Sequence, residues 1–232
     1  MSVELTGTPS YVVNNDHGNS SETITIPADC DAVMVISGSW NNSNSNDFGS
    51  LNFDNGSSVD FSLIVNRDGV GDEYNVWSYI MTAGSVDWPG IGSNTLYWTF
   101  DQTPNEGGSV IVVFLKNVNA SSPVVDTDGG SSTSFTSSLS GVASGDMTFG
   151  FILNFNVDGA DTEAGTGQVE LVSDSGDNST EWSLGYELGE SSFQISCTYA
   201  DYVGIIAWSI AEDLGGGGFE PAWAGGSNQV IA

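Results

Sequence analysis

Positive charge is almost missing from this sequence of 232 residues. Only Arg67 and Lys116 stand against 30 acidic residues, which leaves a formal net charge of −28. Two cations cannot form the positive footprint that a polyphosphate backbone requires, so a nucleic-acid partner is excluded. Carboxylate repulsion opposes the compact state wherever dissolved ions do not screen it. The charge balance therefore predicts a protein adapted to high salt, and a merely acidic surface is the alternative.

Histidine and cysteine are also scarce. His17 is the single histidine, and it lies in a turn-like Asn-Asp-His-Gly segment without a Gly-x-Ser-x-Gly elbow. This argues against a nucleophile of the Ser-His or Cys-His type. One histidine and two distant cysteines do not supply a set of zinc ligands. We expect Cys30 and Cys197 to be free buried thiols, and a single bridge between them is the alternative.

Long apolar runs are missing as well. No stretch approaches the length of a membrane span, and the first residues lack the basic and apolar regions of a secretory signal. We therefore expect synthesis in the cytoplasm without a signal peptide, and no membrane partner. Apolar spacing with a period of 3.6 residues is absent, whereas 30 glycines and many Ser, Thr, Asn and Asp separate short apolar runs. That composition is typical of an all-β fold.

Two apolar runs are predicted to be core strands covered on both faces, residues 108–115 and Val203–Ile210. The segments before these two runs are also alike. Residues 146–155 match residues 31–40, each with an acidic turn residue that leads a strand ending in an aromatic residue. Further matches relate residues 181–186 to 76–80, and residues 192–199 to 95–100. The shared order predicts a duplicated β unit.

The duplication sets the expected domain organisation. We predict two tandem antiparallel β-sandwich domains of jelly-roll-like type, residues 1–121 and 133–214, because each holds several short strands separated by turn residues. Residues 122–132 are expected to be a linker, since a proline there is followed by polar and glycine-rich sequence. Residues 215–232 are expected to be a docking tail behind a hinge of four glycines.

The tail carries large apolar residues that have no obvious place in a completed core. Its candidate assembly residues are Phe219, Pro221, Trp223, Val230 and Ile231. Side chains of this kind need a surface to bury against. We expect the tail to dock on a neighbouring subunit or a larger assembly, and folding back over its own second domain is the alternative.

Calcium is the one metal that the sequence suggests. Two segments place oxygen ligands at alternate positions around a glycine, as a calcium loop does, although neither has the twelve-residue EF-hand spacing. The candidate ligands are Asn66, Asp68, Asp72, Glu73, Asn156, Asp158, Asp161 and Glu163. Ion-free Asp-Gly and Asn-Gly turns in an acidic β protein are the alternative, and no other cofactor is expected.

The seven tryptophans raise the question of sugar binding, because exposed rings stack on sugar faces. Trp77, Trp98, Trp182 and Trp208 lie in strand patterns and are predicted to pack in the core. Trp88 lies in a loop and is the candidate glycan contact. A glycosidase needs only two carboxylates at the right separation. No Glu-x-Asp-x-Glu run exists here, so we expect no enzymatic activity.

The layout of the chain resembles a known group of proteins. Two tandem repeats joined by Ser-Pro-Val-Val-Asp (122–126), with a glycine hinge and a Pro-Ala-Trp-Ala…Asn-Gln-Val-Ile tail (221–231), look like accessory structural proteins of tailed phages and haloarchaeal tailed viruses. The resemblance implies a capsid decoration, turret or fibre protein at the virion surface. Its implied partners are copies of itself, a major capsid or tail protein, and a host surface glycan. The implied homo-oligomer has a trimer as one option. The alternative function is a carbohydrate-binding or adhesin module.

Overall fold

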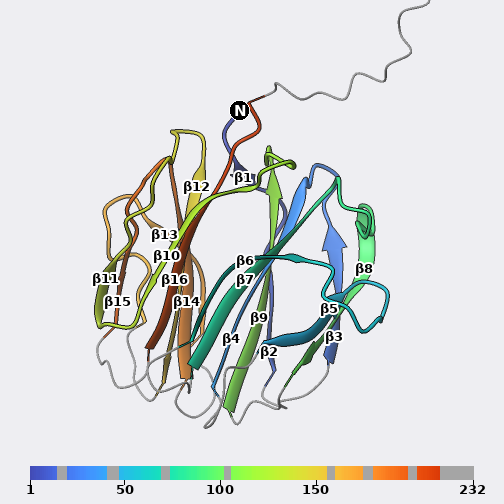
Figure 1. Cartoon of the computed structure of the whole chain (residues 1–232), viewed down its shortest axis with the longest axis horizontal. Helices are drawn as coiled ribbons and strands as arrows, with labels where there is room; N and C mark the ends of the chain where they lie inside the picture. The colour runs from blue at the N-terminus through green and yellow to red at the C-terminus, as the bar shows by residue number, and fades with distance from the viewer. Residues whose placement is uncertain are drawn as a thin grey trace, which may run out of the picture.

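The computed structural model describes residues 1–14, 20–40, 47–68, 74–101, 106–155, 160–174, 180–197 and 203–214, and these residues form strands and turns with no helix (Figure 1). The strands of the first repeat are β1 (Glu4–Leu5), β2 (Ser10–Asn14), β3 (Ser20–Ile26), β4 (Ala32–Trp40), β5 (Phe48–Asn52), β6 (Ser62–Asp68), β7 (Tyr74–Thr82), β8 (Gly92–Phe100) and β9 (Glu106–Lys116). Those of the second are β10 (Val124–Gly130), β11 (Ser134–Thr136), β12 (Met147–Phe155), β13 (Val169–Asp174), β14 (Thr180–Leu188), β15 (Gln194–Ser196) and β16 (Val203–Ile210).

Each repeat pairs a large sheet with a small one. In the first repeat the large sheet has the order β1-β9-β4-β7-β6, with β2 also on β9, and the small sheet has the order β3-β8-β5. In the second repeat the large sheet has the order β10-β16-β12-β14-β13, and β11 pairs with β15. The strand pairs are antiparallel. The predicted all-β fold with two sandwich-like halves is confirmed.

The two large sheets share one strand order, and their registers agree residue by residue. Ala32 of β4 pairs with Leu115 of β9, and Met147 of β12 pairs with Ile210 of β16. Residues 108–115 and 203–210 therefore hold equivalent places, as the sequence comparison predicted. Both runs are buried wherever their burial is described, because each strand is covered by a sheet on both faces.

An acidic residue leads the equivalent strand in each repeat and makes an equivalent hydrogen bond. The Asp31 carboxylate accepts the backbone N–H of Asn117 at 2.5 Å, and the Asp146 carboxylate accepts that of Glu212 at 2.9 Å. Asn117 and Glu212 each lie two residues beyond the equivalent positions Leu115 and Ile210. The duplication thus extends to the turns, where the carboxylate satisfies a backbone donor that the sheet leaves unpaired.

The tryptophans predicted to pack in the core are buried. The predicted match of residues 181–186 to 76–80, which aligns Trp182 with Trp77, is wrong by one residue. In the two registers, Trp182 pairs with Leu153, and the position of the first repeat equivalent to that pair is Val76 with Gly38. Trp182 therefore faces the core between the large sheets, whereas Trp77 faces the core under the small sheet. A shift of one residue places a strand side chain on the opposite face of the sheet. The sequence similarity of the two segments therefore did not predict which core each tryptophan enters.

The largest core lies between the two repeats. It joins buried residues of the first large sheet, such as Met34 and Ile111, to buried residues of the second, such as Phe151 and Trp208. Figure 1 shows the resulting stack of sheets edge-on, with the small sheets outermost. The segment expected to be a linker, 122–132, contains strand β10, which pairs with β16. The repeats are thus packed face to face on a shared core.

Each outer core lies between a large sheet and its small sheet. Cys30 packs in the outer core of the first repeat and Cys197 in that of the second. Both cysteines are buried thiols and neither is in a disulfide, as predicted. The Cys30 thiol donates to the Ala32 carbonyl at 3.1 Å, and burial raises its pKa to about 11.

Candidate functional site

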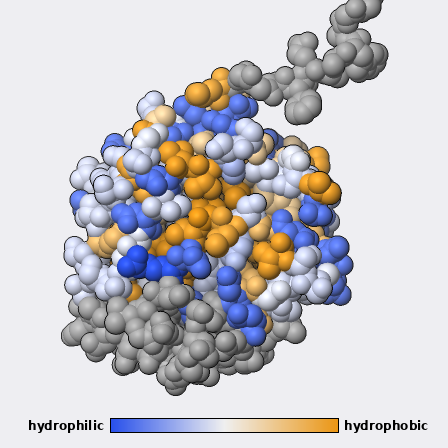
Figure 2. Space-filling view, in the orientation of Figure 1, coloured by the Kyte–Doolittle hydropathy of each residue, from blue (hydrophilic) through white to orange (hydrophobic). Residues whose placement is uncertain are grey.

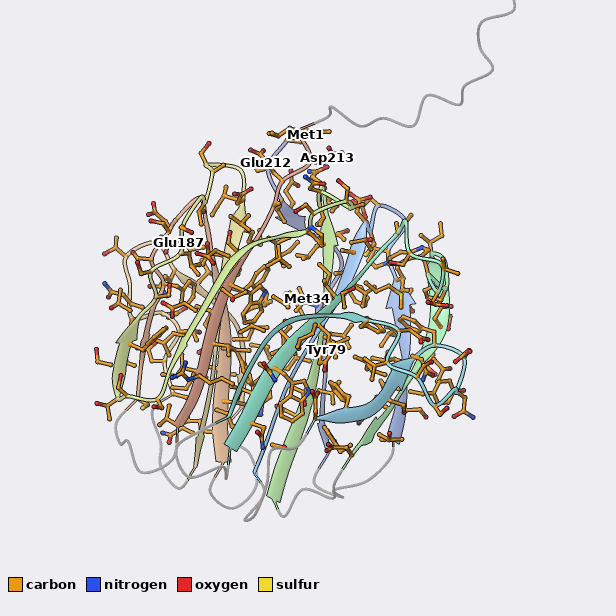
Figure 3. The ribbon with its side chains drawn as sticks, viewed as in Figure 1. Met1, Met34, Tyr79, Glu187, Glu212 and Asp213 are labelled. Carbon is orange, nitrogen blue, oxygen red and sulfur yellow. The ribbon has the colours of Figure 1, made fainter. Side chains whose placement is uncertain are left out.

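One pole of the molecule gathers the chain start, the segment between the repeats and the end of the second repeat. Val118 forms an antiparallel bridge with Glu212, and the Asp213 N–H donates to the Asn117 carbonyl at 2.8 Å. The Val3 N–H donates to the Gly145 carbonyl at 2.8 Å. Figure 3 shows Met1, Glu212 and Asp213 together at this end. We call this end the junction pole, and residue 215, where the tail begins, follows it directly.

The few positive charges near the junction pole are paired. The Lys116 ammonium lies 3.0 Å from Glu4 and 3.5 Å from Asp29, and the Met1 α-amino group lies 3.6 Å from Glu212. The hydrogen bond to Glu4 holds the pKa of Lys116 above its usual value. These pairs satisfy the cations locally, so the pole offers no free cation among the described residues for an anionic ligand.

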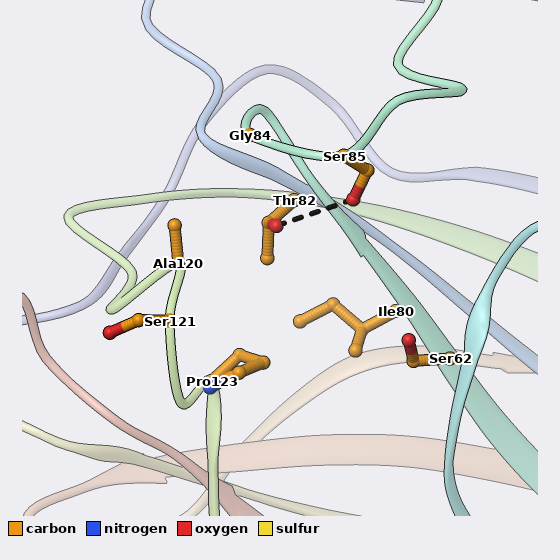
Figure 4. Close-up of a pocket in the computed structure, with 8 residues that line it drawn as sticks. All are labelled: Ser62, Ile80, Thr82, Gly84, Ser85, Ala120, Ser121 and Pro123. Carbon is orange, nitrogen blue, oxygen red and sulfur yellow. Dashed lines mark hydrogen bonds between the residues drawn. The ribbon is translucent and has the colours of Figure 1, made fainter.

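A cavity of about 340 Å³ opens beside the junction pole, between the end of β7 and the segment that joins the repeats (Figure 4). Ile80 and Ser62 form one wall, and Ala120, Ser121 and Pro123 form the other. The turn after β7 closes one end with Thr82, Gly84 and Ser85, where the two hydroxyl groups lie 3.4 Å apart. We call this the junction cavity.

Among the residues that the structure describes, no charged side chain lines the junction cavity, although the chain carries 30 acids. Its lining consists of hydroxyl groups and small or aliphatic groups. Asp126, the first acid along β10, is turned to Ser140, whose backbone N–H and hydroxyl both donate to it at 2.7 Å. These hydrogen bonds lower the pKa of Asp126. The junction cavity is thus a neutral site on a strongly acidic protein.

Apolar surface continues from the junction cavity along the edges of the two large sheets. Figure 2 shows it as a band down the middle of the face on which β6 and β10 lie in Figure 1. Ile64, Val65, Val124 and Val125 are half-buried, and Leu63 is 47% exposed. Farther along β10, the Arg67 side chain packs against Gly129, where a Cβ would lie 2.9 Å from its Cδ. We call the apolar surface on β6 and β10 the edge band.

The predicted calcium ligands are only partly within the described residues. Asn66 and Asp68 lie at the end of β6, whereas Asp161 and Glu163 lie in the turn before β13. The Asp161 carboxylate accepts the Glu163 N–H at 2.7 Å, as in an ion-free turn. Asp72, Glu73, Asn156 and Asp158 lie outside the described residues. Among the residues that the structure covers, no group of three or more His, Cys, Asp or Glu could hold a metal ion, and calcium stays a prediction.

Trp88 lies in the turn between β7 and β8 and is half-buried. The Trp88 side chain packs against the outer core of the first repeat, and the backbone N–H of Trp88 donates to the Ser85 carbonyl at 3.2 Å. It does not line the junction cavity. His17 and the tail residues Phe219, Pro221, Trp223, Val230 and Ile231 lie outside the described residues.

Two side chains with raised pKa values, Tyr79 and Glu187, belong to the packing of the sheets. The Tyr79 hydroxyl donates to Asp47 at 2.8 Å, and burial and this bond raise the pKa of Tyr79 (Figure 3). Burial, together with the charge of Glu190, raises the pKa of Glu187. The two groups lie in different repeats, so they do not form an acid–base pair. The described part of the chain also contains no helix of the length and apolar character needed to cross a membrane.

No protein family, curated protein or solved structure matches the chain. The assignment of a function therefore depends on the geometry and chemistry of the residues themselves. Sequence reasoning missed the junction cavity, because its walls come from β6, β7, the turn after β7 and residues 120–123, which span the predicted boundary between the first sandwich and the linker. The Ser-Ser-Pro of residues 121–123 was the available signal, but it was interpreted as a domain boundary.

Proposed function

We propose that the chain is a non-enzymatic structural protein of a virus particle surface, which assembles in concentrated salt through its C-terminal tail. The observation that carries the proposal is the position of the tail. It begins one residue after Leu214, which is 80% exposed, at the junction pole where the two repeats are tied together. An apolar segment that starts from the rigid end of a folded block is placed for anchoring that block to a neighbour.

The shape of the folded part supports the proposal. One continuous core holds the two large sheets together, so a force on the tail is transmitted to the whole block. A surface protein of a particle needs that rigidity, because its docking contact and its outward face belong to different parts of the molecule. The partners in this proposal are other copies of the chain and a capsid or tail protein.

The net charge of the chain supports the proposed assembly in concentrated salt. A net charge of −28 is strongly self-repelling in dilute buffer and is screened within about 3 Å at 1 M salt. Like charge on neighbouring particles keeps them apart, whereas the tail, with Glu220 as its single acidic side chain, is suited to contact. In this proposal the acidic surface keeps the protein hydrated, and the apolar tail attaches it to its neighbour.

Deletion of residues 215–232 tests the proposal. We expect the truncated protein to keep its far-UV circular dichroism and thermal transition in 2 M NaCl, and to lose self-association by light scattering and occupancy on particles. A matched control replaces residues 219–232 with a Gly-Ser sequence of equal length, which keeps the chain length but removes the apolar side chains. Unchanged association and occupancy in both variants would reject the tail as the anchor.

A further inference from the structure

We propose that the junction cavity is the seat of the chain's own C-terminal tail before assembly, with an aromatic side chain, Phe219 or Trp223, in the cavity. The first support is the chemistry of the site. A neutral cavity lined by hydroxyl groups and by Ile80, Ala120 and Pro123 accepts an aromatic ring that a charged lining would not hold. Its volume of about 340 Å³ is at the lower end of the range of roughly 300–1,000 Å³ typical of ligand pockets.

The second support is distance along the chain. The Ala211 N–H donates to the carbonyl of Pro123, a wall residue of the junction cavity, at 2.9 Å. Residues 212–214 are held at the junction pole, so the reach is counted from Leu214, which lies at most about 10 Å from Ala211. Phe219 follows Leu214 by five residues, and an extended chain spans roughly 3.3–3.6 Å per residue, so Phe219 can reach about 17 Å from Leu214. Trp223 can reach farther. Both side chains are therefore within reach of the cavity.

The third support is the linker between Leu214 and the aromatic residues of the tail. Residues 215–218 are four glycines, which turn back at little steric cost. A short flexible linker raises the effective concentration of an attached segment to the millimolar range, so even a weak contact is populated within one chain. A second copy at micromolar concentration competes poorly. For this reason we assign the seat to the same chain.

The edge band is the proposed contact surface for the remainder of the tail. Residues 224–232 contain Val230 and Ile231 and no acidic side chain, and the edge band offers half-buried aliphatic residues of β6 and β10. Seating the tail there covers apolar surface at the edge of the shared core. This consequence rests on the proposed function: the docked tail is unavailable for assembly until a neighbouring copy or a particle displaces it from the cavity.

Disulfide trapping at low protein concentration tests the seat. The pair Ser121→Cys and Ala224→Cys places one thiol at the exposed rim of the cavity and one beside Trp223. The native thiols are buried and do not compete. We expect an intramolecular disulfide, seen as a monomer by non-reducing electrophoresis and mapped by mass spectrometry. It should form at least about ten times faster than in the control pair Ser93→Cys and Ala224→Cys, whose thiol is on the outer small sheet.

A variant of the cavity lining makes the test specific. A Cβ at Gly84 would meet no atom within 4 Å, so Gly84→Phe adds a ring to the lining of the cavity without a backbone clash. We expect it to slow the cross-link to the rate of the control pair. Val86→Phe adds the same ring to the same turn at a side chain that is 99% exposed, and should leave the rate unchanged.

The outcomes separate the two proposals. A covalent dimer would assign the seat to a second copy, and a cross-link unaffected by Gly84→Phe would reject the cavity; either result overturns the inference. If the truncated protein associates normally while the intramolecular cross-link forms as expected, the proposed function fails and the seat stands. If association is lost on truncation and no cross-link forms, the seat fails and the proposed function stands.

Discussion

The indole N–H of Trp208 in the second repeat donates to the thioether sulfur of Met34 in the first, at 3.2 Å. The two residues are 174 positions apart in sequence and are both buried. Trp208 also stacks on Phe149, with ring centroids 5.6 Å apart. A polar contact inside an apolar core fixes the relative position of the two sheets as well as their separation.

Truncation of Trp208 should therefore destabilise both repeats together. We expect Trp208→Ala to lower the free energy of unfolding by about 3–5 kcal/mol, the usual cost of removing a buried aromatic side chain. Thiol labelling during urea unfolding in 2 M NaCl reports each half, because Cys30 and Cys197 lie in different outer cores. Both thiols should become reactive at one lower midpoint. Exposure of Cys197 alone, with Cys30 still protected, would mean that the halves unfold independently.

Gly150 of β12 should tolerate no side chain. A Cβ there would lie 2.4 Å from the ring of Phe193, which is fully buried under the two-stranded sheet. We expect Gly150→Ala to lower the free energy of unfolding by about 1–3 kcal/mol, the usual cost of overpacking a core. Gly84→Ala is the matched control, because its Cβ meets nothing within 4 Å. Similar thermal midpoints for the two variants would show that the two-stranded sheet shifts freely to make room.

Much of the fold could be predicted from the sequence, because apolar alternation identified most strands and repeated patterns identified most equivalent pairs. Val203–Ile210 and residues 108–115 are the clearest case, since their match holds in the registers. The packing of one repeat on the other could not be predicted in this way. Strands covered on both faces look the same in sequence whether the second cover is a small sheet or another repeat.

The candidate site was harder to predict for a related reason. The cavity walls come from uncharged residues of three separate segments of the sequence, namely Ser62, Ile80, Thr82, Gly84, Ser85, Ala120, Ser121 and Pro123. No motif identifies such residues, because their grouping depends on β10 joining the second large sheet. Glycine-rich sequence at residues 128–130 suggested a linker. In the structure Gly130 instead lets the Phe135 ring approach closely, where a Cβ would lie 2.3 Å from it.

The carboxylate of Asp146 should be more important for stability than its position in a turn suggests. It is buried and accepts two backbone N–H groups, from Ala143 at 2.7 Å and from Glu212 at 2.9 Å. Charge-assisted hydrogen bonds contribute roughly 1.5–3 kcal/mol each, so Asp146→Ala should cost about 3 kcal/mol. Asp146→Asn keeps one acceptor and should cost less. The exposed Asp87→Ala is the control and should be neutral; equal losses in thermal midpoint would contradict the assignment.

Alkaline pH should weaken the fold through Cys30. Burial raises the pKa of this thiol from 9.0 to about 11, so the folded chain resists its ionisation while the unfolded chain does not. The stabilising contribution is complete below pH 9 and is lost as the pH rises toward 11, by on the order of 2 kcal/mol. Cys30→Ala should flatten the decline in urea midpoint between pH 9 and 11. Since Tyr79 adds to the same decline, Tyr79→Phe should flatten it further in combination, and an unchanged slope would contradict the prediction.

Salt should stabilise this protein mainly by screening its own charge. With a net charge of −28 and two cationic side chains, we expect the thermal midpoint to rise by on the order of 10 °C between 0.05 and 2 M NaCl. Salts also strengthen apolar burial, so a rise alone does not identify the cause. Replacing three exposed acids, in the variant Glu22→Gln, Asp87→Asn, Glu190→Gln, should separate the two effects. Because self-repulsion scales roughly with the square of the net charge, the rise should shrink by about a fifth while the midpoint in dilute buffer increases. An identical salt dependence in the variant and the parent would show that screening is not what the salt supplies.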